Sequence, residues 1–404
     1  MVIAFVNALF VAALFSALTG KCKNSKMGGP DLFNFSIRKI ADPRKIIQGF
    51  GYPAEAHKIV TEDGYVLVLH RIPRGKKKAP VLIMHGIGSS SADFVNMGPK
   101  VSLGYVLADK GYDVWIGNAR GNSYSNRNVY VNPKLHPEKF YNFSWHEIGT
   151  IDLPAKIDYV LNVTKQKKIY YIGHSQGGTI FYVMASIKPE YNDKIRLASL
   201  MAPAGLVNNV PEPLIKFLSQ YINRIQSVLE LLHIYHIPAL DLIRSFLQNL
   251  CKYDRYFALC REIFYTFGGG YSDDTQLNKS VFTRIFETTP SDASSKQFLH
   301  FFQEVKSGKF QHFDYGPEGN SRNYGTLNPS EYNLTAVTAP VALYYAQNDR
   351  FVGVKDIQLI TSKLPQVVKS YLVPYEKFNH GDFLFANDVK KLIYNELLRV
   401  MDVY

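Results

Sequence analysis

The chain has 404 residues, 46% of them hydrophobic and 14% aromatic, which excludes a disordered protein and provides enough apolar side chains for a large core. Lys and Arg outnumber Asp and Glu by 46 to 34, which gives a formal net charge of +12. The basic runs at 74–78 and 165–168 contain no interleaved aromatic residues, so we expect solvated loops and no nucleic-acid partner. Attraction to anionic lipid surfaces is the alternative role for this charge.

Residues 1–20 contain no charged side chain, and their apolar run ends at Thr19 and Gly20, before Lys21. This length is typical of a secretory signal peptide and short for a membrane span; an uncleaved anchor is the alternative. A secretory route also agrees with five Asn-x-Ser/Thr sequons, which are candidate glycosylation sites: Asn34, Asn142, Asn162, Asn278 and Asn333. We therefore predict a signal peptide at 1–20 and a mature domain at 21–404.

Short apolar runs with turn residues at their ends follow along the chain. Residues 57–73 alternate around Asp63-Gly64, which predicts a β-hairpin. Helix-like segments separate most of the later runs; in 152–162, for example, we expect Asp152 to cap the helix and Pro154 to lie in its first turn. This alternation predicts a mostly parallel α/β sheet with helices on both faces. The runs that predict its strands are 81–86, 112–117, 169–173, 196–202 and 341–346.

The segment 168–186, KIYYIGHSQGGTIFYVMAS, joins an apolar strand to a helix with almost no loop. Ser175 lies at this tight turn, where Gly173 and Gly177 avoid the collisions that Cβ atoms would cause. Such a turn is typical of a nucleophile elbow, which exposes the serine oxygen. Gly-x-Ser-x-Gly alone is a weak signal, and an ordinary Gly/Ser turn is the alternative; the flanking strand and helix favour the elbow.

Between about 206 and 305 the pattern becomes helical. Apolar residues at 215, 218, 222, 225 and 229 step by three and four, which predicts one amphipathic helix, and similar patterns occupy 238–250 and 292–305. We predict a helical cap inserted between two strands, with the α/β core at about 45–205 and 306–404. The apolar faces of these helices either belong to the core or meet an apolar substrate.

Two of the three cysteines, Cys251 and Cys260, lie nine residues apart within this insertion. In an oxidising compartment we expect them to form a disulfide, and two separate buried thiols are the alternative. Cys22 has no evident partner in the sequence.

A serine nucleophile needs a base within hydrogen-bond reach and an acid that fixes the tautomer of that base. In α/β-hydrolases the order along the chain is Ser, then Asp or Glu, then His. Asp349 follows the apolar run 341–346, and His380, the only histidine beyond it, follows the run 370–375. We predict Asp349 as the acid and His380 as the base. Asp356 and Asp382 are weaker candidates for the acid.

An oxyanion hole needs two N–H donors, and we predict the backbone N–H groups of Gln176 and Ile87. Ile87 belongs to a loop, His85-Gly86-Ile87, that directly follows a predicted strand. We expect His85 to shape its loop and His174 to pack in the elbow, and neither to transfer a proton. No pair of His or Cys residues has metal-ligand spacing, so we predict no metal site and no cofactor.

Several longer segments resemble the acid lipase family, the α/β-hydrolases related to gastric and lysosomal acid lipases. The resemblance extends over nearly the whole mature chain, and together its motifs are highly specific. The chain departs from the family at Gly178, where the family often has Thr, and at Gly381, because the family usually has an apolar residue after the catalytic histidine. The segments that carry the resemblance are GYPAEAHKIVTEDGYVLVLHRIP at 51–73, HGIGSSSADFVNMGP at 85–99, GYVLADKGYDVWIGNARGNSYS at 104–125, FSWHEIGTIDLPAKIDYVL at 143–161, GHSQGG at 173–178 and FDYGPEGNSRNYG at 313–325.

The resemblance implies a triad, an oxyanion hole, a helical cap with a lid, and a disulfide. Its residues would be Ser175, Asp349 and His380, the N–H groups of Ile87 and Gln176, and the pair Cys251 and Cys260.

The expected activity is hydrolysis of lipid esters, acylglycerols or sterol esters, through an acyl-enzyme. The expected setting is a lipid–water interface, outside the cell or in the lysosomal lumen, and no obligate protein partner is evident. Two alternatives remain: an esterase for small soluble esters, and a lipid-binding or storage protein that has the fold without turnover.

Overall fold

The computed structural model describes residues 36–73, 79–272, 275–277 and 279–404. The predicted signal peptide at 1–20, Cys22, the basic run 74–78 and the sequons at Asn34 and Asn278 lie outside the described residues.

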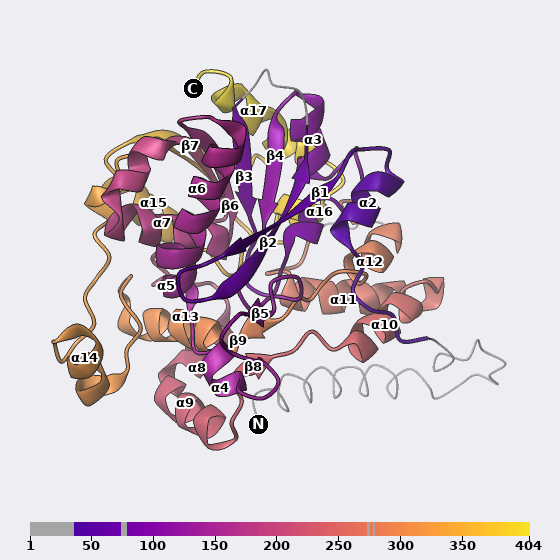
Figure 1. The fold of residues 1–404 in the computed structure, drawn as a ribbon. Coiled ribbons are helices and arrows are strands. Elements are labelled where there is room, and N and C mark those ends of the chain that lie inside the picture. Colours follow the sequence, from indigo (N-terminus) through magenta and orange to yellow (C-terminus); the bar gives the residue numbers. More distant parts are fainter. Residues whose placement is uncertain (1–35, 74–78, 273–274, 278) are drawn as a thin grey trace, which may run out of the picture.

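A nine-stranded sheet forms the centre of the molecule (Figure 1). Its spatial order is β1-β2-β4-β3-β6-β7-β10-β11, with the short β5 paired to β2. Pairings from β4 to β11 are parallel, whereas β1, β2 and β4 pair antiparallel. The predicted mostly parallel sheet is therefore confirmed. The strands are β1 (Glu55–Val60), β2 (Tyr65–Ile72), β3 (Pro80–Met84), β4 (Asp113–Gly117), β5 (Arg127–Asn128), β6 (Ile169–His174), β7 (Ile195–Met201), β10 (Val341–Tyr345) and β11 (Val367–Leu372).

The predicted hairpin is formed by β1 and β2. Between them the chain turns at Gly64, whose φ of +88° is accessible to glycine without strain. The strand before His380 is β11, which ends at Leu372, so only the first three residues of the run 370–375 belong to a strand. Pro374 has no N–H for a further ladder bond, which agrees with this end point.

Helices cover both faces of the sheet, and alternate side chains of the central strands enter two separate cores. In β3, Val81 and Ile83 belong to one core, whereas Leu82 and Met84 belong to the other. This explains why β3, β4, β6 and β10 are buried along their whole length and read as continuous apolar runs. The first core is covered by α3 (Leu103–Asp109), α16 (Asp382–Phe385) and α17 (Asn395–Met401), and the second by α6 (Leu153–Thr164), α7 (Gln176–Ile187) and α15 (Val354–Lys363).

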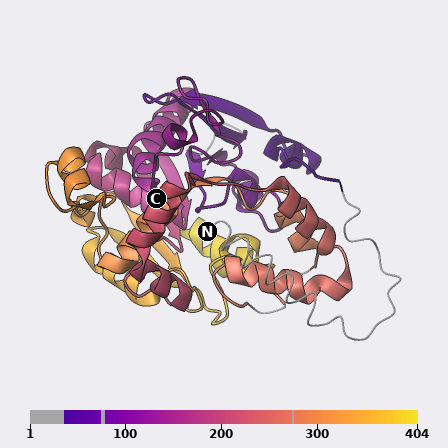
Figure 2. The ribbon, with the colours of Figure 1, turned by 90° about the horizontal axis from the view of Figure 1, so that it is seen from below.

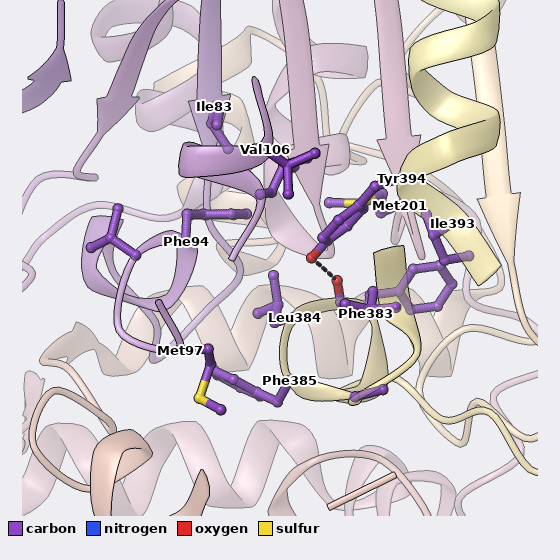
Figure 3. Close-up of a cluster of buried hydrophobic side chains, with 14 of the residues drawn as sticks. Ile83, Phe94, Met97, Val106, Met201, Phe383, Leu384, Phe385, Ile393 and Tyr394 are labelled. Carbon is purple, nitrogen blue, oxygen red and sulfur yellow. Dashed lines mark hydrogen bonds between the residues drawn. The ribbon is translucent and has the colours of Figure 1, made fainter. Parts of the chain in front are cut away.

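Figure 3 shows part of the first core, where side chains from distant parts of the chain meet. Ile83 of β3 and Val106 of α3 lie there with Met201 of β7. The Tyr394 hydroxyl donates a hydrogen bond of 2.8 Å to the carbonyl oxygen of Phe383, which ties the C-terminal helices to α16. The C-terminal helices thereby hold the segment that follows His380 against the sheet.

The predicted N-cap of α6 is wrong. Asp152 has helical dihedral angles and ends a π-helical turn, Ile148–Asp152, that continues into α6. Its carboxylate instead accepts hydrogen bonds from Arg120, at 3.0 Å from the backbone N and 2.8 Å from Nε. Because a buried guanidinium requires a carboxylate partner, this tertiary pairing replaces the local cap.

The segment between β7 and β10 is mainly helical, and its helices lie below the sheet in Figure 1 and in front of it in Figure 2. The single helix predicted over 215–229 is two helices, because the chain leaves the helical conformation at Tyr221. Its elements are α8 (Pro213–Gln220), α9 (Ile222–Leu231), β8 (His236–Ile237), α10 (Asp241–Leu250), α11 (Phe257–Phe267), α12 (Lys279–Ile285), β9 (Ala293–Ser294), α13 (Ser295–Ser307) and α14 (Gly316–Tyr324).

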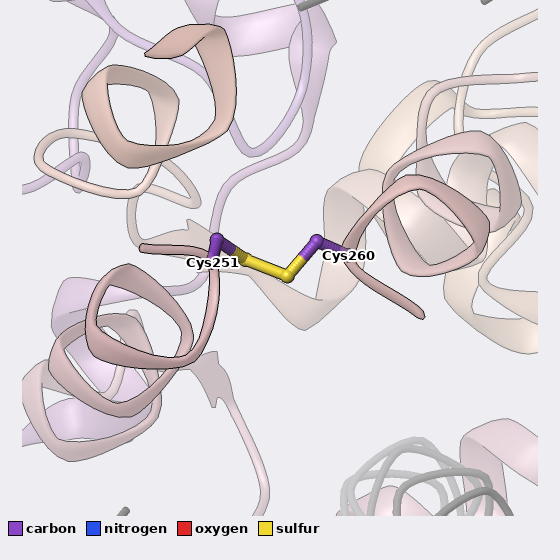
Figure 4. Close-up of a disulfide and its surroundings, with 2 residues drawn as sticks. All are labelled: Cys251 and Cys260. Atoms are coloured by element: carbon purple, nitrogen blue, oxygen red, sulfur yellow. A yellow bond between two sulfur atoms is a disulfide. The ribbon is translucent and has the colours of Figure 1, made fainter. Parts of the chain in front are cut away.

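Cys251 and Cys260 form a disulfide that joins the end of α10 to α11 (Figure 4). By loop-closure entropy, a bridge that closes nine residues contributes roughly 2.5 kcal/mol to the free energy of unfolding.

We expect dithiothreitol to lower the Tm of the wild type, because reduction of this disulfide removes that contribution. The double variant Cys251→Ser/Cys260→Ser should have the lower Tm without reductant and should not respond to it. A thiol assay would confirm that the disulfide has been reduced. If the reduced wild type then has the same Tm as the oxidised protein, the disulfide makes no such contribution.

The side chains of Asn142, Asn162 and Asn333 are exposed, as a glycan requires, so these sequons remain candidate glycosylation sites. The basic run 165–168 is an exposed connection between α6 and β6, as predicted. Within the described part of the chain, no helix is long and apolar enough to cross a bilayer.

Candidate active site

Ser175 occupies a strained turn between β6 and α7. Its φ of +54° and ψ of −120° lie outside the regions that non-glycine residues prefer, and such strain typically amounts to about 1–3 kcal/mol. The backbone of Gly177 passes so close to β3 that a Cβ atom there would lie 2.4 Å from the Met84 carbonyl oxygen. A Cβ atom on Gly173 would lie 2.6 Å from the Gly177 backbone. The elbow geometry predicted from the glycines is present.

Gly178, where the related family often has Thr, lies in the first turn of α7, beside Pro203. A Cβ atom on Gly178 would lie 2.3 Å from the Cβ atom of Pro203, so the proline occupies the space of a side chain. In this chain a threonine at 178 would require Pro203 to move.

Asp349 and His380 form a hydrogen-bonded pair beyond the ends of β10 and β11. The His380 Nδ1 and Asp349 Oδ2 atoms are 2.7 Å apart, and both side chains are buried. The other oxygen, Oδ1, accepts the backbone N–H groups of Phe351 at 2.8 Å and Val352 at 2.9 Å. With its carboxylate fixed in this way, Asp349 accepts a hydrogen bond from the Nδ1–H of His380, and this tautomer leaves a lone pair on Nε2.

The residue before the serine brings the elbow to the histidine loop. His174 Nε2 donates a hydrogen bond of 3.1 Å to the His380 carbonyl oxygen, and the two imidazole centroids are 4.8 Å apart. Among the described residues, no hydrogen bond joins Ser175 Oγ to the His380 ring. Hydrogen bonds of this kind are often long without substrate and tighten when the substrate binds.

The loop after β3 lies directly against the serine. A Cβ atom on Gly86 would be 2.9 Å from Ser175 Cβ and 3.3 Å from its Oγ, and Ile87 is the next residue. Gln176 is the first residue of α7, where a backbone N–H has no acceptor within the helix. Both predicted oxyanion donors are thus on segments that border Ser175.

Family models and curated relatives agree with this geometry. A model described as the alpha/beta hydrolase fold matches residues 79–386, and one described as a partial alpha/beta-hydrolase lipase region matches 43–98. Lipase 3 of Drosophila melanogaster is 42% identical over 376 residues, which cover 91% of this chain and 94% of the relative. The gastric triacylglycerol lipase of Bos taurus is 35% identical over 88% of this chain and 90% of its own. The chain belongs to the lipase family of α/β hydrolases.

The expected family, fold and class of enzyme, a serine carboxylic ester hydrolase, are thereby confirmed. Among solved structures, a proposed lipase from Sulfolobus solfataricus covers 86% of this lipase and 93% of its own chain, with a TM-score of 0.58 and 17% identity. At that identity the match supports the fold alone. The residue roles within this lipase rest on its own geometry.

His85 has a defined tautomer in this lipase and holds the loop after β3. Its Nε2 atom accepts the Ala119 backbone N–H at 3.1 Å, so the ring proton is on Nδ1 and is donated to the Gly86 carbonyl oxygen at 2.7 Å. Burial lowers the pKa of His85 to about 4, so the ring stays neutral. Burial also lowers the pKa of His174. Both rings make structural hydrogen bonds, His85 within the loop after β3 and His174 from the elbow to the His380 backbone.

The two other aspartates that the sequence offered as acids lie elsewhere. Asp356 accepts hydrogen bonds from Asn209, at 2.8 Å from its backbone N and 2.7 Å from its side-chain amide. Asp382 Oδ2 accepts the Asn379 backbone N–H at 2.9 Å and the Ser272 hydroxyl at 2.6 Å. Burial raises the pKa of Asp382 to about 7. Of the three candidates, Asp349 is the one hydrogen-bonded to the His380 ring.

Two contacts from the helical insertion reach this site and were not predicted from the sequence. Gln297 of α13 donates a hydrogen bond of 3.1 Å to the side-chain oxygen of Gln176. The glycine run 268–270 lies between the loop that contains Asp349 and the loop that contains His380. A Cβ atom on Gly269 would be 2.6 Å from His380 Cβ. Three consecutive glycines were the available signal for the second contact. Within the described residues, no group of three His, Cys, Asp or Glu side chains is arranged to hold a metal ion.

Proposed function

We propose that this lipase hydrolyses acylglycerols or sterol esters through an acyl-enzyme on Ser175. The observation that carries the proposal is the Asp349–His380 hydrogen bond of 2.7 Å beside a strained serine elbow. A nucleophile, a base with a fixed tautomer and a buried acid are the groups that acyl transfer requires. The names of the relatives, among them gastric triacylglycerol lipases, support a lipid ester as the substrate.

In the proposed reaction, Ser175 Oγ attacks the acyl carbonyl carbon and gives its proton to His380 Nε2. The N–H groups of Ile87 and Gln176 stabilise the negative oxygen of the tetrahedral intermediate. The intermediate then expels the alcohol, which takes the proton from His380. Asp349 stays ionised throughout and stabilises the imidazolium.

Water completes the cycle by the same steps. Water gives a proton to His380 as it attacks the acyl-enzyme, and the second tetrahedral intermediate then releases the fatty acid while His380 returns that proton to Ser175 Oγ. A direct test of the nucleophile is labelling with an organophosphonate ester followed by peptide mass analysis. Label on Ser175 supports the assignment, whereas label elsewhere contradicts it.

Large apolar side chains on the insertion support binding at a lipid–water interface. The most exposed are Leu231, at 77%, and Phe217, at 59%. Exposed apolar side chains on amphipathic helices favour contact with an apolar phase. We define the exposed apolar face as Leu214, Phe217, Tyr221, Leu231 and Leu232, which lie on the consecutive helices α8 and α9 or at their ends.

The double variant Phe217→Ser/Leu231→Ser is expected to lower the rate on emulsified triacylglycerol about tenfold, because the loss of apolar area weakens adsorption to the lipid. Hydrolysis of a soluble short-chain ester should not change. Leu327→Ser is a matched control, since Leu327 is 64% exposed and lies after α14, outside the exposed apolar face. Equal losses on both substrates, or none on the emulsion, would rule out this role.

We also propose that the lipase enters the secretory pathway, for secretion or for the lysosomal lumen. The Cys251–Cys260 disulfide and the exposed sequons support this route. Removal of N-glycans from protein expressed in eukaryotic cells should increase its electrophoretic mobility, and an unchanged mobility would argue against glycosylation.

A further inference from the structure

A strap of five consecutive residues, Gly268–Ser272, follows α11 and contacts two loops. The acid loop, 348–350, contains Asp349, and the histidine loop, 379–382, contains His380. Every residue of the strap is hydrogen-bonded to a residue within two positions of either Asp349 or His380. These contacts join parts of the chain that are about 80 to 110 residues apart.

Three strap residues contact the histidine loop on both sides of His380. The Gly268 carbonyl oxygen accepts the Gly381 backbone N–H at 2.8 Å, and the Gly270 carbonyl oxygen accepts the Asn379 side-chain amide at 2.6 Å. The Ser272 hydroxyl donates to Asp382 Oδ2 at 2.6 Å.

Asn379 and Asp382 also bond to each other across His380. The backbone N–H of each donates to a side-chain oxygen of the other, both at 2.9 Å. This reciprocal pair closes a tight turn around the histidine, and the strap holds both of its ends.

The two remaining strap residues contact the acid loop on both sides of Asp349. The Gly269 carbonyl oxygen accepts the Arg350 backbone N–H at 3.0 Å, and the Tyr271 carbonyl oxygen accepts the side-chain amide of Asn348. The strap is thus a bridge between the acid loop and the histidine loop, in addition to the Asp349–His380 bond itself.

Glycine is required for this close approach. Gly269 and Gly270 have φ values of +79° and +129°, and a Cβ atom on Gly270 would lie 2.8 Å from the Asn348 carbonyl oxygen. Gly381 contributes from the other side, since a Cβ atom there would lie 2.9 Å from the Phe264 ring of α11. The departure from the family at Gly381 therefore allows α11 and the strap to pack against the histidine loop.

We propose that the strap is a positioning element that sets the alignment of His380 with Asp349, so that the acid–base pair is complete only when this part of the insertion is docked. The strap continues directly from α11, which the disulfide ties to α10. The inference rests on the proposed function, because the strap acts through the roles given to Asp349 and His380.

Gly269→Ala tests the strap, with Gly316→Ala as its matched control. Both positions have similar positive φ values, +79° and +75°, but a Cβ atom on Gly316 has no neighbour within 4 Å. We expect Gly269→Ala to lower kcat for a soluble short-chain ester about 10²-fold with little change in KM, because small misplacements of catalytic groups have effects of that size. The low-field proton resonance of the His380 Nδ1–H bond should disappear. Gly316→Ala should change neither.

A second pair of variants applies even where Gly269→Ala does not fold. Asp382→Ala removes the acceptor of Ser272 and Asn379 and is expected to lower kcat about tenfold, whereas the conservative Asp382→Asn keeps an acceptor oxygen and should retain most of kcat. Folded Gly269→Ala with wild-type kcat and resonance, or equal kcat values for the two Asp382 variants, would overturn the proposal. Hydrolysis by the wild type and its loss in Ser175→Ala test the proposed function separately from the strap.

Discussion

Replacement of Ser175 by alanine is expected to lower kcat for a soluble ester about 10⁶-fold, because no other group in the site could form the acyl-enzyme. The fold should be unchanged, since alanine at this position differs from serine by one oxygen and is under the same backbone strain. Stopped-flow and steady-state assays would measure the loss, and near-UV circular dichroism and the Tm would check the fold.

Ser186→Ala is the matched control for this experiment. Ser186 lies on the same helix, α7, and its Oγ atom has no hydrogen-bond partner among the described residues, so the variant should have wild-type kcat. Activity of Ser175→Ala within tenfold of the wild type would mean that another residue is the nucleophile.

Asp349→Asn is expected to lower kcat about 10⁴-fold through the tautomer of His380. The Oδ1 position accepts two backbone N–H groups, from Phe351 and Val352, and therefore selects the amide oxygen of an asparagine. The amide NH₂ would then face His380 Nδ1 and favour the tautomer with the proton on Nε2. That tautomer cannot accept the proton of Ser175.

Asp356→Asn controls for the loss of a buried carboxylate, because Asp356 is bonded to Asn209 and not to the His380 ring. Its kcat per folded molecule should match the wild type. The pH dependence of kcat/KM on the soluble ester, measured for both variants, separates a tautomer effect from unfolding. Equal losses for the two variants would refute the assignment of Asp349 as the acid.

The strands and the three triad positions could be predicted because their signals are local. The central strands β3, β4, β6 and β10 are short apolar runs, Ser175 and Asp349 each follow the carboxyl end of such a run, and His380 lies beyond the carboxyl end of β11. The carboxyl ends of parallel strands lie at one edge of a sheet, so residues that follow them meet there although they are far apart in sequence. Their proximity can be predicted without knowledge of side-chain packing. The antiparallel hairpin was equally local, because Asp63-Gly64 specifies the turn.

The errors and omissions have tertiary causes. Asp152 has the residue type of an N-cap, but buried Arg120 binds its carboxylate. The apolar spacing over 215–229 is compatible with one helix, and the break at Tyr221 has no strong signal such as Pro or Gly. The Gln297–Gln176 bond joins residues 121 apart, and no local pattern encodes a pairing at that separation. The glycine run of the strap was visible, but its acceptors and donors were not.

If Ser175 is the nucleophile of a lipase, its replacement must abolish fatty-acid release from emulsified triacylglycerol. Wild type, Ser175→Ala and Ser186→Ala would be compared on the emulsion, on emulsified sterol ester and on a soluble short-chain ester, from acidic to neutral pH. We expect release from an emulsified lipid by the wild type and Ser186→Ala and none by Ser175→Ala. Release from the soluble ester alone, or no release from any substrate, would contradict this expectation.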